Sequence, residues 1–197
     1  KIFINTTGIG EILKPNISSN NISKDDLIIV SRDIGTHGAT IFAAREGIDL
    51  ESNLQSDCAS LYPIVKRLID ENINITALRD ATRGGLSAVL NEWANQSNVC
   101  IEIKEEKIPL KDEVKGICEL VGFEAYDLAN EGTFVLAIHK NDALKTVEIL
   151  NEFNENNSAS IIGEVTNQYE KKVVLLSPWG TKRFLETPTG ELLPRIC

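Results

Sequence analysis

Short apolar runs alternate with helical apolar stripes along most of this chain, and that order limits the fold more than any other feature. Apolar runs of about four to eight residues are typical of strands, whereas apolar residues three or four positions apart indicate helices. Residues 134–138 are apolar throughout, as in a strand that is buried on both faces. The pattern predicts an α+β domain, layered like an α/β protein, with a mixed β-sheet flanked by helices.

The chain divides into four expected regions. Residues 1–11 alternate and contain β-branched side chains, so a strand is expected within residues 1–14, as the remnant of a preceding domain. Residues 15–24 are polar, with no expected core positions, and are interpreted as a linker. A domain at 25–185 and a flexible tail at 186–197 follow. The strands expected in the domain lie at 26–32, 99–103, 134–138, 161–162 and 173–176, and the helices at 35–46, 61–69, 86–94, 114–121 and 143–150.

Charge and cysteine usage exclude several classes of partner. The net charge of -9 argues against nucleic acid or an anionic membrane surface as the main partner. No apolar run approaches the roughly 20 residues that cross a membrane, so no membrane partner is expected. The four cysteines lack the spacing of a zinc site, and no metal site is predicted. Cys58, Cys100 and Cys118 are interpreted as small core residues, in a pattern that fits the reducing cytoplasm.

The last residue of the sequence is a cysteine, Cys197. A thiolate is both a good nucleophile and a tolerable leaving group, so such a sulfur can accept an acyl-like group and give it away. The residues before it read as a loop, and a chain end of this kind can reach a second site. An ordinary cysteine that happens to stand last is the alternative, and the tail alone does not separate the two.

Two glycine-bearing turns each join a strand to a helix. In the first, residues 32–40, free amides at the helix start could bind an anion, or the turn could simply use Thr36 as a cap and His37 as a structural donor. In the second, residues 78–85, arginines at a glycine-rich helix start suit a phosphate or a carboxylate. An ion-pair cluster of Arg79, Asp80 and Arg83 that pins the turn is an equal alternative.

Glu131 stands beside a glycine at the start of the buried strand at 134–138. Strand ends project into clefts, which makes this a suitable position for a general base. Most glutamates at such junctions are only solvated, and the local sequence favours that simpler interpretation.

Taken together, these segments resemble the HypE family of hydrogenase maturation factors. The resemblance runs in one order over essentially the whole chain. The matching stretches are FINTTGIG at 3–10, GTHGAT at 35–40, SDCA at 56–59, ALRDATRGGL at 77–86, ANEG at 129–132, IIGEV at 161–165 and PRIC at 194–197. The wider superfamily includes aminoimidazole ribonucleotide synthetase, selenophosphate synthetase and thiamine-monophosphate kinase. None of these is expected to end in a carrier cysteine.

The resemblance implies a carbamoyl dehydratase of [NiFe] hydrogenase maturation. Its terminal cysteine would receive a carbamoyl group from HypF, dehydrate it to a thiocyanate with ATP and donate cyanide to iron on the HypC–HypD scaffold. The chain resembles the C-terminal domain only. The missing N-terminal ATP-binding domain would supply most ligands of ATP and Mg²⁺ and the homodimer interface, so this chain alone is expected to be inactive.

The resemblance also assigns roles to residues. Cys197 would be the carrier and Glu131 the base. Two alternative functions remain open. The chain could be a non-catalytic docking domain for maturation partners, or part of an ATP-dependent synthetase or kinase that acts on a small metabolite. The residues expected to border the cleft where tail and nucleotide meet are His37, Gly38, Arg79, Asp80 and Arg83.

Overall fold

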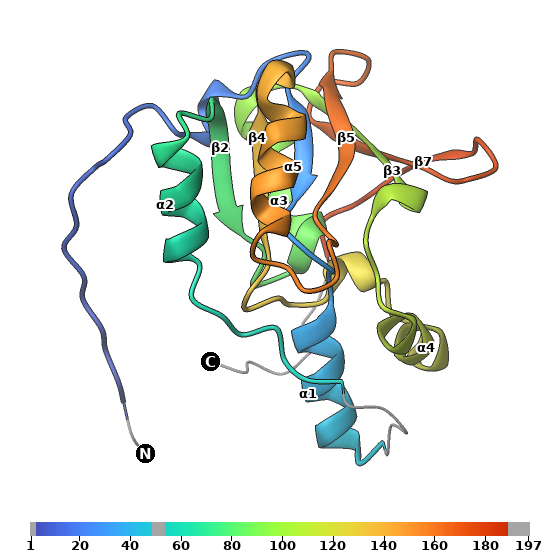
Figure 1. Cartoon of the computed structure of the whole chain (residues 1–197). Helices are drawn as coiled ribbons and strands as arrows, with labels where there is room; N and C mark the ends of the chain where they lie inside the picture. Colours follow the sequence, from blue (N-terminus) through green and yellow to red (C-terminus); the bar gives the residue numbers. More distant parts are fainter. Residues whose placement is uncertain (1–2, 49–53, 189–197) are drawn as a thin grey trace.

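A seven-stranded sheet forms the centre of the computed structural model, which describes residues 3–48 and 54–188 (Figure 1). Its strands are ordered β2-β4-β1-β5-β3-β6-β7. The β3–β6 pair is parallel and the other pairs are antiparallel, so the predicted mixed sheet is confirmed. The strands are β1 Leu27–Val30, β2 Ile75–Asp80, β3 Cys100–Lys104, β4 Phe134–Ile138, β5 Ser160–Thr166, β6 Lys172–Leu176 and β7 Lys182–Phe184.

Helices cover both faces of the sheet and extend beyond one end. Helix α3 packs on one face, α2 and α5 pack on the other, and α1 and α4 lie together past the ends of the strands (Figure 1). The α+β class is therefore confirmed. The helices are α1 Thr36–Glu46, α2 Tyr62–Asp70, α3 Gly85–Ser97, α4 Asp112–Val121 and α5 Ala143–Asn151, with 3₁₀ turns at Ser19–Asn21, Glu105–Lys107, Ala125–Asp127 and Lys140–Asp142.

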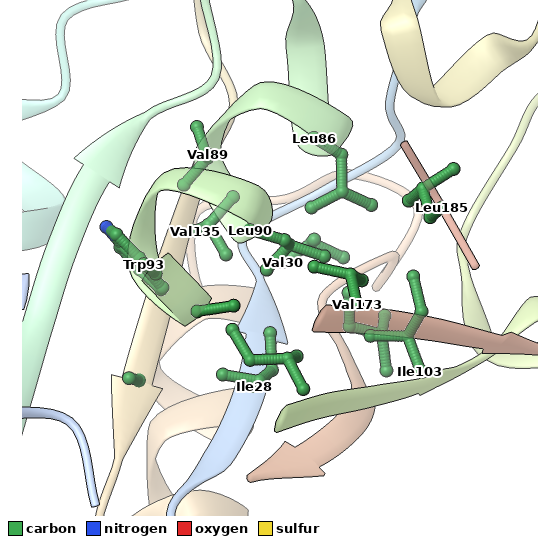
Figure 2. Close-up of a cluster of buried hydrophobic side chains, with 14 of the residues drawn as sticks. Ile28, Val30, Leu86, Val89, Leu90, Trp93, Ile103, Val135, Val173 and Leu185 are labelled. Atoms are coloured by element: carbon green, nitrogen blue, oxygen red, sulfur yellow. The ribbon is translucent and has the colours of Figure 1, made fainter. Parts of the chain in front are cut away.

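Strand β4, which lies between β2 and β1, separates two hydrophobic clusters of the interior. Side chains alternate between the faces of a strand, and both faces are covered here. Val135 and Ala137 pack in the cluster under α3, which Figure 2 shows with Leu90 and Trp93 of that helix. Phe134 and its alternate neighbours pack under α2 and α5. The uninterrupted apolar run of β4 follows from this burial on both sides.

Two expectations for the N-terminal region are wrong. Residues 3–14 form no strand, and Phe3 and Ile4 are largely exposed, because no described strand lies alongside for pairing. Residues 15–24 do contain a core position, since Ile22 is buried in the cluster under α3. The Ser18 amide also donates to the Thr76 carbonyl of β2, at 2.9 Å. That segment is docked on the domain, and the division of the chain into domains stays a prediction.

One cysteine also departs from the expectation. Cys100 and Cys118 are buried as predicted, but Cys58 is exposed because its segment crosses the surface. Cys197 lies outside the described residues. None of the described helices is long and apolar enough to cross a membrane.

Replacing the fully buried Phe134 tests the burial of β4. We expect Phe134→Ala to lower the free energy of unfolding by about 3–5 kcal/mol, because it removes an aromatic ring and leaves a cavity. The exposed Leu144→Ala should change it by less than about 0.5 kcal/mol. Chemical denaturation measures both, and similar losses for the two variants would contradict this description of the core.

Candidate functional site

Asn130 ties three turns together from a fully buried position. Its Oδ1 accepts a hydrogen bond of 2.7 Å from the Gly35 amide, just before α1. Its Nδ2 donates to the Ala81 carbonyl at 2.9 Å and to the Leu128 carbonyl at 3.0 Å. Buried polar groups of this kind are costly to leave unpaired. The side chain therefore fixes both predicted glycine turns against the loop that carries Glu131.

Two glycines allow the backbones to meet at this point. A Cβ on Gly85, whose φ is 57°, would lie 2.4 Å from the Tyr126 carbonyl oxygen. A Cβ on Gly132 would lie 1.7 Å from the Asp57 carbonyl oxygen. Neither distance is compatible with a side chain. The start of α3 and the segment at 54–59 therefore pack directly on the 126–132 loop.

Asp57 holds the Glu131 loop from the outside. Its Oδ1 accepts a 3.0 Å hydrogen bond from the Glu131 amide, and its Oδ2 lies 2.9 Å from Thr133 Oγ1. Both carboxylate oxygens are thus engaged in positioning the loop. The neighbouring Ser56 Oγ lies 2.8 Å from His37 Nδ1 and extends the contact to α1.

The Glu131 side chain is half-buried and makes no hydrogen bond or ion pair with a described residue. Its backbone is fixed while its carboxylate remains available. A carboxylate in that state can accept a proton from a group brought next to it.

His37 and Gly38 lie in the first turn of α1 and are buried. His37 Nε2 has no partner among the described residues, whereas Nδ1 meets Ser56. The Gly38 amide donates to the Ala129 carbonyl at 2.9 Å. That amide therefore has no proton left for a phosphate. Thr36 is not the cap, since the N-cap residue is Gly35 and Thr36 Oγ1 has no described partner.

The second turn is not held by the ion-pair cluster that its sequence suggested. Arg79 pairs with Glu92 on α3 instead. Asp80 and Arg83 are exposed and make no ion pair with a described residue. The structure therefore brings His37, Gly38 and Glu131 together around the 126–132 loop, while Arg79 faces α3.

A polar cleft of about 450 Å³ adjoins this cluster on the other side of Asp57. Its lining includes Arg32, Asp33, Thr36, Asp57 and Lys111, but none of the residues predicted for the site. Within residues 3–48 and 54–188, no group of three or more His, Cys, Asp or Glu side chains could hold a metal ion.

The last described residues lead to the turn before α3. Leu185 is buried in the cluster under α3, and its carbonyl accepts a 2.9 Å hydrogen bond from Asn91 Nδ2. Pro188 then lies beside Gly84, at 3.6 Å from the position of a Cβ on that glycine. Nine further residues, 189–197, lie outside the described structure. Nine residues can span up to roughly 30 Å.

Comparison with known proteins identifies the domain. The model of the AIR synthase related protein C-terminal domain family matches residues 23–175. The chain belongs to this family. Two structures of thiamine-monophosphate kinases from Aquifex aeolicus and Stenotrophomonas maltophilia share the fold, with TM-scores of 0.57 and 0.58 at 21% and 14% identity.

Other relatives are much more similar. The chain is 42% identical over its whole length to the carbamoyl dehydratase HypE of Escherichia coli and to a putative hydrogenase expression/formation protein of Methanocaldococcus jannaschii. It spans 58% of the length of each. A crystal structure of the hydrogenase maturation protein HypE superposes with a TM-score of 0.89 at 33% identity, over 94% of this chain and 60% of that one. The predicted resemblance to HypE is confirmed.

Asn130 and Asp57 were not among the residues predicted for the site. Both stand inside stretches that carry the resemblance, ANEG and SDCA, so the motifs pointed to them. Their roles as hydrogen-bonding anchors depend on partners 49 to 95 residues away, which no local pattern reveals.

Removing the Asn130 side chain should loosen all three turns. We expect Asn130→Ala to lower the free energy of unfolding by about 2–4 kcal/mol, because the Gly35 amide and two carbonyls lose their buried partner. Denaturant titration measures the loss, with the exposed Asn156→Ala as control. A loss below about 0.5 kcal/mol would show that Asn130 is not the anchor.

Proposed function

We propose that this chain is the C-terminal part of an ATP-dependent carbamoyl dehydratase that matures [NiFe] hydrogenase in the cytoplasm. The observation that carries the proposal is the match to HypE proteins along the full length of the chain, Cys197 included. The geometry around Glu131 supports it, because its unpaired carboxylate stands on a hydrogen-bonded backbone and the start of α3 contacts both the 126–132 loop and Pro188.

The proposed reaction begins with a carbamoyl group on the Cys197 sulfur. Its oxygen is a poor leaving group until it takes the terminal phosphoryl group of ATP, which leaves ADP. Glu131 then accepts a proton from the amide nitrogen, and the second nitrogen proton is lost to solvent as phosphate departs with the oxygen. The carbon–nitrogen bond becomes a nitrile on sulfur. In net terms the thiocarbamate loses one water while ATP becomes ADP and phosphate.

Several residues of this chain would border the reacting groups. Arg83 is exposed at the start of α3, beside the described end of the tail, and suits a phosphate. His37 and Gly38 would support the site by packing, and Asp80 would lie at its rim. ATP and Mg²⁺ would be held mainly by the preceding half of the protein, so the chain alone would be inactive.

The partners follow from the chemistry of the carrier. A HypE–HypF complex is among the similar structures, at 36% identity and a TM-score of 0.80, and a HypF-type carbamoyltransferase would load Cys197. A HypC–HypD iron scaffold would receive the cyano group, with sulfur as the leaving group. HypE has also been solved in complex with ATP, which supports ATP as the energy source. The complete protein is proposed to be a homodimer.

The carrier is tested by Cys197→Ser in the chain joined to its preceding half. We expect no stable adduct after incubation with the carbamoyltransferase, carbamoyl phosphate and ATP, because a serine hydroxyl is far less nucleophilic than a thiolate. Mass spectrometry of the C-terminal peptide measures the adduct. Cys58→Ser, which removes an exposed thiol in the described structure, should leave it intact. An adduct that persists in Cys197→Ser but is lost in Cys58→Ser would reject Cys197 as the carrier.

The base is tested separately by Glu131→Gln in the same protein. Carbamoylation should proceed, whereas loss of one water from the adduct should slow by about 100-fold or more, because general base catalysis is lost. The exposed Glu148→Gln serves as the matched control. Dehydration at the normal rate in Glu131→Gln would leave the carrier in place but remove Glu131 as the base.

A further inference from the structure

A second cavity lies between α4 and the turn that joins β6 to β7. It is a groove of about 670 Å³. In Figure 1 this turn and α4 stand on the side of the molecule away from α2. The apolar floor of the groove is formed by Ile108, Leu110, Phe123, Ala125 and Tyr126.

Trp179 stands at the edge of this groove and is 89% exposed. The turn that carries it is well fixed, because the Ser177 amide donates to the Thr181 carbonyl at 2.9 Å and the Thr181 amide to Ser177 Oγ at 3.1 Å. A large aromatic side chain held in solvent on a rigid turn gains nothing for the fold. Such residues, next to an apolar depression, are typical anchors of protein interfaces.

The rim of the groove is acidic. Glu105, Glu119 and Glu124 line it. Lys115 lies 3.9 Å from Glu119 and Arg183 lies 3.1 Å from Glu124, so one net negative charge remains.

Burial, together with Glu124 and Glu119, raises the pKa of the Cys118 thiol to about 11. Burial also raises the pKa of Tyr126, whose hydroxyl donates to Glu105 at 2.7 Å. Both groups resist ionisation partly because the groove already carries negative charge.

We infer that this groove binds a basic amphipathic segment of a partner protein. Apolar side chains of that segment would pack on the floor and against Trp179. Its Lys or Arg side chains would replace Lys115 and Arg183 as partners of Glu119 and Glu124, because both existing ion pairs are exposed and weak. A small ligand fits less well, because ligand pockets enclose most of their occupant and here one wall stands free in solvent. The groove does not share its lining with the polar cleft beside Asp57. It includes Tyr126 of the 126–132 loop but none of the residues proposed to take part in the dehydration.

The probe is a synthetic peptide of about 18 residues in which Leu and Lys alternate at helical spacing, with a Leu/Glu peptide of the same pattern as its counterpart. Trp179 reports the contact by its fluorescence, because the other tryptophan, Trp93 of α3, is buried in the core. We expect saturable binding of the Leu/Lys peptide with a blue shift of emission, and weaker binding at high salt. The Leu/Glu peptide should not bind.

Variants in the groove and matched control variants localise the contact. Fluorescence anisotropy of a labelled Leu/Lys peptide measures its binding to each variant. Trp179→Ala, and Glu119→Gln combined with Glu124→Gln, should each weaken binding by about tenfold. Controls of the same chemistry elsewhere, Leu144→Ala and Glu148→Gln combined with Glu155→Gln, should stay within about twofold. Equal binding by all variants, saturation by the Leu/Glu peptide or no saturable binding would overturn the inference. So would a dimer that Trp179→Ala dissociates, because a second copy would then occupy the groove.

Discussion

The hydrogen bonds of Asn130 are the constraint on which the site depends. One buried amide joins the start of α1, the turn before α3 and the 126–132 loop, three segments that belong to different layers of the fold. Water cannot replace these bonds at a fully buried position without opening the core. The side chain of Glu131, one residue later, therefore starts from a backbone that is held on both sides.

The sheet provides the rigid support for this arrangement. Every residue of β4 is buried, and the strand begins directly after Glu131 and Thr133, which donate hydrogen bonds to Asp57. Leu185 anchors the outgoing chain against α3 before it reaches Pro188. The 126–132 loop and Pro188 thus both adjoin the start of α3. The proposed carrier thiol and base would require that combination, since the thiol must travel and the base must not.

Local patterns predicted the elements better than the contacts between them. The apolar run at 134–138 predicted the bounds of β4 correctly. Pro63 lies in the first turn of α2, where a missing amide proton costs little. Strand β7 was missed because its three exposed residues are held by pairing with β6 and show no apolar pattern. The ion pair of Arg79 with Glu92 was not predicted, because Glu92 lies thirteen residues away on α3. The Glu131 prediction came from the family motif, and its anchor Asp57 became visible only in three dimensions.

The central claim is that the Cys197 thiol comes to rest beside Glu131, and a disulfide trap tests it most directly. In a Cys58→Ser background, Glu131→Cys should form an intramolecular disulfide with Cys197 under mild oxidation, because a disulfide needs Cα atoms within roughly 7 Å. Glu148→Cys on α5 should not form one. The bridged peptides are identified by mass spectrometry without reduction. Bridging at position 131 in preference to 148 is the predicted result, and equal or absent bridging at 131 would contradict the account.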